Sequence, residues 1–195
     1  MGKDVIIACD FADKETALNF LDKFEGRKPF VKIGMELFYA EGPQIVREIK
    51  ARGHKIFLDL KLHDIPNTVK KSMAVLSRLD VDMCNLHAAG TSRMMEAALE
   101  GLTRPDGTRP LLIAATQLTS TSQEAMERDL WIQKPIDEVV MHYAENAKKA
   151  GLADICKFCG FVPDVQMPSL YARADLFLFP SLYDNFGLVK VDGAA

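Results

Sequence analysis

The most informative segment of the chain is Asp59-Leu60-Lys61-Leu62-His63-Asp64-Ile65-Pro66-Asn67-Thr68. It follows an apolar run, so Asp59 and Lys61 are predicted to point to the same side of a strand, about 6.5–7 Å apart along the chain. Asp64 comes where that strand should end, and Pro66 suits the first turn of a helix. A lysine between two carboxylates is costly to assemble, and the carboxyl end of a strand is where α/β proteins usually carry out their chemistry.

Short apolar runs alternate with longer amphipathic segments on both sides of this segment. The apolar runs predict strands over residues 5–9, 30–33, 55–60, 81–86 and 111–116. The amphipathic segments predict helices over residues 14–24, 43–52, 66–79, 92–101 and 136–150. Five strand–helix units in succession predict an α/β fold with parallel strands and right-handed crossovers. A complete (β/α)-barrel takes about 250 residues, so the 195 present predict a truncated or incomplete TIM-like barrel.

Composition excludes several classes of protein. The net charge is −3, from 24 basic and 27 acidic residues, which argues against a partner that is a nucleic acid or an anionic membrane. No apolar run approaches the roughly 18–20 residues of a membrane span, and the first residues do not have the pattern of a signal peptide. The four cysteines suggest no secreted disulfide framework, so a cytoplasmic location is expected.

Motifs at the ends of the predicted strands resemble those of bacterial orotidine 5'-monophosphate decarboxylases. The matching segments are 8–11, 31–36, 57–68, 85–90 and 116–120, in the family's order, within residues 1–152. The Asp-x-Lys-x-x-Asp core is shared with related phosphate-sugar barrels, whereas the extension over residues 63–68 is typical of the decarboxylase branch. The resemblance implies a (β/α) barrel that converts orotidine 5'-monophosphate to UMP and CO2 in de novo pyrimidine biosynthesis, without a cofactor.

The resemblance also implies catalytic roles for Asp59, Lys61 and Asp64. Decarboxylation leaves a carbanion on the pyrimidine ring, and no metal site is predicted from the motifs, so placed charges must supply the help. Lys61 would stabilise the carbanion and deliver the proton, and each aspartate about 4 Å from it would contribute roughly 4 kcal/mol at an effective dielectric constant near 20. Asp59 would also repel the substrate carboxylate until CO2 leaves. In the family the Asp64 position is supplied across a dimer interface, which implies a homodimer.

Further positions match substrate-binding residues of the family. Asp10 and Lys32 match residues that hold the ribose hydroxyls, and Thr119 and Ser120 match a loop over the pyrimidine. His87 matches a position near the site, and Thr68 ends the most specific motif.

Ordinary structural roles remain open for most of these residues. A lysine flanked by aspartates is most often a surface ion pair worth less than about 1 kcal/mol. Asp10 would serve as a helix N-cap, and Lys32 would point outward into solvent. His87 would be a buried imidazole with satisfied hydrogen bonds, while Thr119 and Ser120 have ordinary loop roles.

Residues from about 151 to 195 follow a different pattern and resemble the donor-binding half of a GT-B glycosyltransferase; Gly151-Leu152 could belong to either family, so the boundary is drawn after residue 152. The matching stretches are 158–164, 170–175, 176–181 and 186–189, and they predict a βαβα segment that completes or caps the barrel. Asp184 and Asp192 stand where that family has two longer glutamates, which weakens the match. The Gly-rich turn and the Gly-Arg pair by which decarboxylases grip the substrate phosphate are not seen in the tail.

The chain is therefore interpreted as a hybrid, a decarboxylase whose activity is impaired by the loss of that grip. The alternatives are an inactive hybrid scaffold or a binder of pyrimidine nucleotides, and a glycosyltransferase fragment is the least favoured. Cys156 and Cys159 have the spacing of half a zinc site or of a redox pair, but no companion ligands with similar spacing are visible. Met94 and Met95 are most simply explained as core residues.

Overall fold

The computed structural model describes residues 5–24 and 26–152. It contains a parallel sheet of five strands in the order β1-β2-β3-β4-β5. The strands are β1 (Ile6–Ala8), β2 (Phe30–Gly34), β3 (Ile56–Leu62), β4 (Met83–His87) and β5 (Leu111–Ala115). The predicted α/β fold with five parallel strands is thus confirmed. The predicted sixth and seventh units, and the boundary drawn after residue 152, lie outside the described residues.

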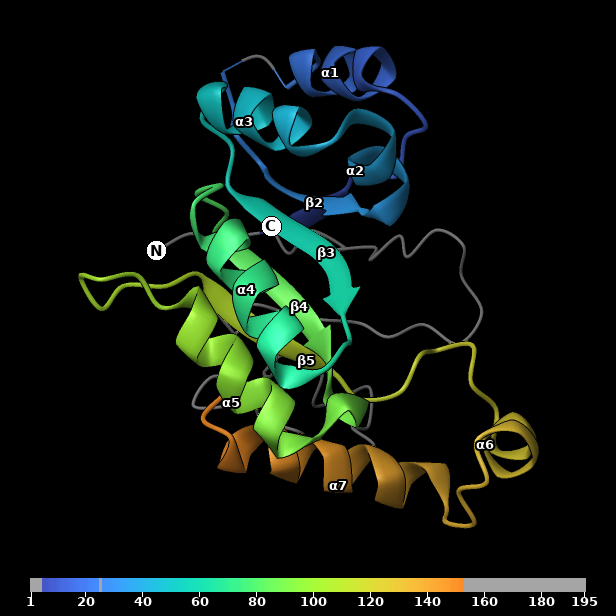
Figure 1. The fold of residues 1–195 in the computed structure, drawn as a ribbon. Coiled ribbons are helices and arrows are strands. Elements are labelled where there is room, and N and C mark those ends of the chain that lie inside the picture. Colours follow the sequence, from blue (N-terminus) through green and yellow to red (C-terminus); the bar gives the residue numbers. More distant parts are fainter. Residues whose placement is uncertain (1–4, 25, 153–195) are drawn as a thin grey trace, which may run out of the picture.

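The helices connect successive strands and pack on one another around the sheet (Figure 1). Those predicted from the sequence are α1 (Lys14–Asp22), α3 (Pro43–Ala51), α4 (Pro66–Ser77), α5 (Thr91–Leu102) and α7 (Ile136–Lys149). The α4–α5 contact is the most extensive between helices, and α7 packs on α5. No helix in the described part of the chain is both long enough and apolar enough to cross a membrane.

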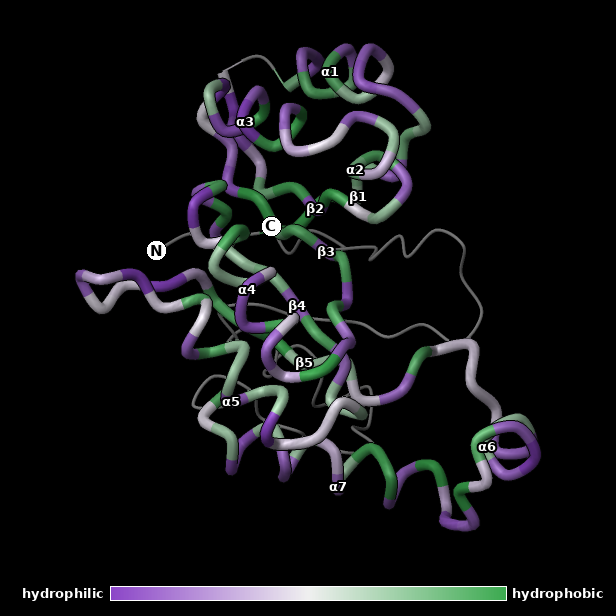
Figure 2. The backbone as a smooth tube through the Cα atoms, in the orientation of Figure 1, coloured by the Kyte–Doolittle hydropathy of each residue, from purple (hydrophilic) through white to green (hydrophobic). Residues whose placement is uncertain are grey.

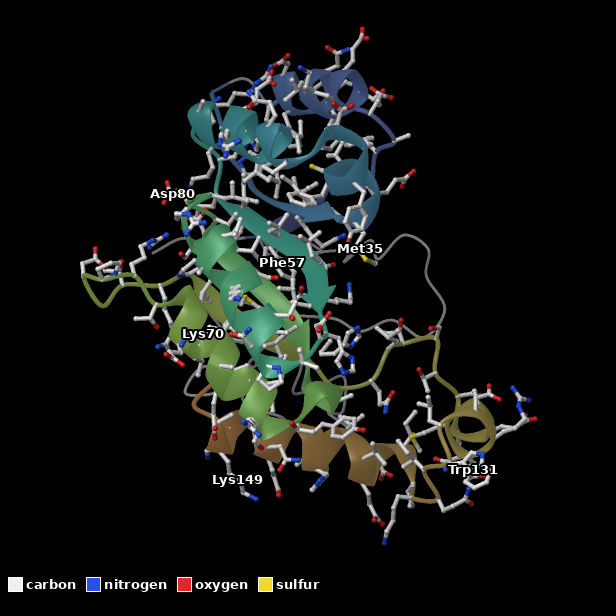
Figure 3. All side chains as sticks on the ribbon, in the orientation of Figure 1. Met35, Phe57, Lys70, Asp80, Trp131 and Lys149 are labelled. Carbon is white, nitrogen blue, oxygen red and sulfur yellow. The ribbon has the colours of Figure 1, made fainter. Side chains whose placement is uncertain are left out.

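Two short helices and one 3-10 turn were not predicted. They are α2 (Met35–Glu41), α6 (Gln123–Asp129) and the 3-10 turn η1 (Ala88–Gly90). Helix α2 follows β2 directly, and Gly42, with a φ of 67°, separates it from α3. Helix α6 stands apart from the sheet, and the exposed Trp131 lies just beyond its end (Figures 1 and 3).

Local sequence explains where several helices begin. Helix α1 is capped by Asp13, whose side chain accepts a 2.8 Å hydrogen bond from the backbone N–H of Thr16. Pro43 and Pro66 occupy the first turns of α3 and α4, where a missing N–H costs nothing. The suggestion that Asp10 caps the first helix is therefore wrong, because Asp13 holds that position.

Side chains alternate between two apolar layers on opposite faces of the sheet. The larger layer joins the helices to strand residues such as Val31, Leu58 and Leu86, and it includes Met94 and Met95, as predicted. The smaller layer takes one side chain from each strand: Ile6, Phe30, Phe57, Met83 and Ile113. Apolar colouring follows the strands in Figure 2, and Phe57 is labelled on β3 in Figure 3. We call this smaller layer the apolar floor, because the polar residues of the sheet lie next to it on the same face.

Candidate active site

Polar side chains form a second layer directly above the apolar floor. Lys32 follows Phe30 by two residues on β2, and Asp59 follows Phe57 by two on β3. Because strand side chains alternate, a step of two keeps the residue on the same face and moves it toward the carboxyl end. The sequence therefore places these charged groups at the end of the sheet where parallel α/β folds bind ligands.

A row of alternating charges begins just after β1 and runs across β2 and β3. The Lys61 Nζ donates to Asp59 Oδ1 at 2.6 Å, and the Lys32 Nζ lies 3.7 Å from Asp59 Oδ2. Lys32 also donates to Asp10 Oδ1 at 2.8 Å. The structure thus brings four of the predicted site residues together, in the order Asp10, Lys32, Asp59 and Lys61. The alternative that Lys32 points outward into solvent is wrong, since it contacts two carboxylates.

Asp59 is the centre of this row and stays ionised. Its side chain is only 12% exposed, and burial acts to raise the pKa of its carboxyl group. Hydrogen bonds from Lys61 and Asn85 and the charges of the two lysines outweigh burial, so the pKa lies below its ordinary value of 3.8. A carboxylate this well held presents a fixed negative charge beside the Lys61 ammonium.

Lys61 has a backbone conformation that is rare for a residue with a side chain. Its φ is 48°, and the pairing of β3 with β4 shifts register between Leu58 and Leu62. A non-glycine residue in the left-handed region costs of order 1 kcal/mol or more, and such residues cluster at functional sites. The irregularity corrects the expectation of a regular strand from Asp59 to Lys61, although the two side chains do meet as predicted.

Asn85 on β4 was not predicted as a site residue. It is 4% exposed. Its Nδ2 donates to Asp59 Oδ1 at 2.6 Å, and its Oδ1 accepts from the Lys61 backbone N–H at 2.8 Å. The sequence did hold a signal for it. Asn85 comes two residues after Met83 of the apolar floor, just as Asp59 comes two residues after Phe57, so both side chains are expected on the same face of the sheet.

His87 and His63 lie beside the row of charges. Their ring centroids are 5.7 Å apart. Burial lowers the pKa of His87, and the nearby His63 and Lys61 lower it further, while Asp59 opposes them. His87 is therefore held near the site as a neutral imidazole at neutral pH. His63 was not predicted as a site residue, although it lies in the most specific motif.

The remaining predicted residues are exposed and do not contact this row within one chain. The Asp64 side chain accepts from the Ile65 N–H at 2.6 Å, and across residues 5–24 and 26–152 no ion pair joins it to Lys61. Within one chain Lys61 thus meets Asp59, while the expected contact with Asp64 across a dimer interface stays a prediction. Thr68 lies in the first turn of α4, while Thr119 and Ser120 form a turn after β5.

The arrangement offers a localised positive charge to an anionic centre. Lys61 is 27% exposed, so its ammonium is partly withdrawn from water yet reachable. Charges fixed in such a place stabilise developing charge more strongly than they do in water. Within the described ranges, no group of three or more His, Cys, Asp or Glu side chains is placed to hold a metal ion.

Comparison with known proteins identifies relatives of the chain. The sequence model of the "Orotidine 5'-phosphate decarboxylase / HUMPS family" matches residues 3–194. The orotidine 5'-phosphate decarboxylase of Bacillus cytotoxicus is 57% identical over 155 residues, which are 78% of this chain and 65% of that protein. The chain thus spans less than two thirds of the length of this relative.

Two solved structures share the fold. The crystal structure of orotidine 5'-phosphate decarboxylase from Lactobacillus acidophilus is 36% identical, with a TM-score of 0.73 over 88% of this chain and 76% of that one. The crystal structure of an uncharacterized conserved protein from Geobacillus kaustophilus is 54% identical, with a TM-score of 0.73 over 75% of this chain and 70% of that one. The described sheet is therefore similar to decarboxylase TIM barrels.

The comparisons correct the interpretation of residues 153–195. The family match continues through residue 194, across the stretch that resembles a glycosyltransferase. None of these comparisons supports a glycosyltransferase segment or a hybrid chain. Short matches such as Phe186-Gly187-Leu188-Val189 are too common in α/β proteins to assign a family by themselves. The predicted elements of this tail, and Cys156 and Cys159, lie outside the described residues.

Proposed function

Because this chain belongs to the orotidine 5'-phosphate decarboxylase / HUMPS family, we propose that it converts orotidine 5'-monophosphate to UMP and CO2. This reaction would place the chain in de novo pyrimidine biosynthesis, as a lyase of the cytoplasm. One observation carries the proposal: the Lys61 ammonium donates a 2.6 Å hydrogen bond to the Asp59 carboxylate, at the carboxyl end of a parallel strand.

In the proposed reaction, the charge of Asp59 destabilises the ground state and the charge of Lys61 stabilises the transition state. The substrate carboxylate would lie beside Asp59, and the repulsion between the two anions would disappear as CO2 departs. The electron pair left on the ring carbon would face the Lys61 ammonium, which stabilises it and then transfers a proton to it. Lys61 would return to its charged form by taking a proton from solvent.

Other residues of the row are proposed to bind the ribose and the ring. Asp10 and Lys32 form an acceptor and a donor at 2.8 Å from each other, which suits a pair of ribose hydroxyls. His87 lies next to Lys61 as a neutral ring, while Thr119 and Ser120 follow β5 at the same end of the sheet. These roles follow from the resemblance and from position.

A homodimer is proposed to complete the site. Asp64 and Thr68 are exposed at the start of α4, and Asp64 does not reach the Lys61 of its own chain. An exposed carboxylate in this position is available to the Lys61 of a second copy related by a two-fold axis. The second copy would then supply the second anion that the motif predicts.

Loss of ultraviolet absorbance by orotidine 5'-monophosphate tests the proposed reaction. The wild-type chain should consume the substrate, although slowly if the phosphate grip is missing from the tail. Lys61→Ala should lower the rate by at least about 100-fold. Lys70→Ala, which removes an exposed lysine on α4 paired with Glu100, is the control and should leave the rate unchanged.

Equal rates for wild type and Lys61→Ala would contradict the mechanism. If the wild-type chain shows no turnover, calorimetry with UMP decides between the remaining functions. Binding without turnover would make the chain a pyrimidine-nucleotide binder, and no binding would leave only a scaffold. No separate sugar-nucleotide activity is proposed for residues 153–195, since nothing in the comparisons supports one.

A further inference from the structure

Asn85 carries a buried amide that has no role in the proposed mechanism. It lies on β4, one strand away from the lysine and aspartate that carry the proposed chemistry. Buried amides must satisfy both their carbonyl and their NH2 group, so the partners of Asn85 show what it is there to hold.

The two hydrogen bonds of Asn85 fix its orientation. A carboxylate only accepts and a backbone N–H only donates, so the NH2 must face Asp59 and the carbonyl must face the Lys61 backbone. These contacts are 2.6 Å and 2.8 Å long. The amide therefore bridges the carboxylate and the backbone of the residue whose ammonium that same carboxylate binds.

This bridge lies where the strand pairing is irregular. The register between β3 and β4 shifts between Leu58 and Leu62, and Lys61 has a positive φ. The side chain of Asn85 accepts from the Lys61 N–H at the point where the ladder is interrupted. It offsets part of the cost of the strained backbone, and the strain sets the direction in which the Lys61 side chain leaves the strand.

We propose that Asn85 is a positioning residue for the decarboxylation, a clamp that fixes the Asp59 carboxylate and the Lys61 backbone relative to each other. This inference rests on the proposed function. Asn85 acts through its two partners and does not touch the reacting atoms. Its loss leaves the charges in place but lets their separation and direction vary, and a reaction that depends on placed charge is sensitive to both.

Steady-state kinetics of the full chain test the clamp. Asn85→Ala should lower kcat by about tenfold or more, the equivalent of one hydrogen bond to a charged group. KM should change little, because both polar groups of Asn85 are used by the protein. Asn146→Ala is the matched control, since Asn146 lies on α7 and its amide contacts His142. That control should keep the wild-type kcat.

Two spectroscopic measurements separate positioning from general loss of structure. In an NMR titration, the pKa of the Asp59 carboxyl group should rise in Asn85→Ala, because a hydrogen bond that favours the charged form is gone. The Lys61 amide should exchange with solvent faster, because its acceptor is gone. Asn85→Ser, a smaller change, should shift both in the same direction if Asn85→Ala does not fold.

The outcomes are distinct. Unchanged titration of Asp59 and unchanged exchange of the Lys61 amide in a folded variant would overturn the clamp. A fall in kcat for Asn146→Ala as large as that for Asn85→Ala would also overturn it. Absence of turnover in the wild-type chain would refute the proposed function, while the NMR titration and amide exchange would still decide whether Asn85 holds both partners.

Discussion

Gly101 on α5 should tolerate no side chain, although alanine is the better helix former. A Cβ built on Gly101 would lie 2.0 Å from the backbone oxygen of Lys70 on α4. Real Cβ contacts essentially never fall below 3.0 Å, so α4 and α5 would have to separate by at least 1.0 Å, the difference between these distances. The obstacle is backbone, and no rotamer change relieves it. The two helices also carry the Lys70–Glu100 ion pair at this point.

Two opposing energies decide the sign of Gly101→Ala. Alanine gains about 1 kcal/mol of helix propensity over glycine. Overpacking a close contact costs about 1–3 kcal/mol, and a clash with backbone belongs at the upper end. We therefore expect Gly101→Ala to lower the free energy of unfolding by about 2 kcal/mol, the difference between these contributions.

Urea denaturation of the full chain measures this change, with an internal control on the same helix. Glu96 is exposed on α5, so Glu96→Ala should be more stable than Glu96→Gly by about 1 kcal/mol. That pair gives the propensity difference without a clash. If Gly101→Ala proves as stable as the wild type while the Glu96 pair behaves as expected, the close approach of α4 and α5 is refuted.

Three further predictions concern the site, its ionisation and a helix cap. If Asp64 acts on the Lys61 of a partner, Lys61→Ala and Asp64→Ala should each be inactive. An equal mixture of the two variants should recover about a quarter of the wild-type rate, because half the dimers then hold one intact site of their two. A mixture no more active than either variant alone would argue against a shared site. Acid should destabilise the chain in two stages. Because the pKa of His87 is lowered in the folded state, the free energy of unfolding should fall as the pH drops below about 6.5, where the unfolded state gains a proton that the folded state resists. Because the pKa of Asp59 is also lowered, its contribution to stability is present above pH 3.8 and is lost as the pH falls through the pKa of the folded state. Urea titrations across pH check this: His87→Asn should abolish the first stage, and Asp59→Asn should weaken the second, to which the lowered pKa values of Asp13, Asp106 and Asp129 also contribute. Asp13→Ala should cost about 1 kcal/mol through loss of the α1 cap, whereas Asp13→Asn, which can still accept from Thr16, should cost less in the same urea assay.

The elements that the sequence predicted well are those with a clear period. Apolar runs located all five strands of the described sheet, and Asp59 and Lys61 were placed on one side of β3 by the alternation of strand side chains. Helices α2 and α6 were missed because each spans seven residues, about two turns, and such a segment shows little periodicity.

The candidate site was predictable in its charges but not in its connections. Lys32 contacts Asp10, just after β1, and Asp59 on β3, so the pattern of its own strand could not predict which way its side chain points. Asn85 was missed because an asparagine carries no charge and because its importance depends on its hydrogen bonds to Asp59 and Lys61 on the neighbouring strand β3. The positive φ of Lys61 could not be predicted from the sequence, because lysine does not favour this conformation and only tertiary contacts maintain it.

Exchange of the ring hydrogen of UMP for deuterium most directly tests the claim that Lys61 stabilises a carbanion. By microscopic reversibility, a site that protonates the ring carbon after CO2 leaves must also deprotonate it in the product. In D2O, proton NMR should show the wild-type chain exchanging this hydrogen faster than the buffer does, and Lys61→Ala reduced to the buffer rate. Exchange by Lys61→Ala at the wild-type rate would contradict the account.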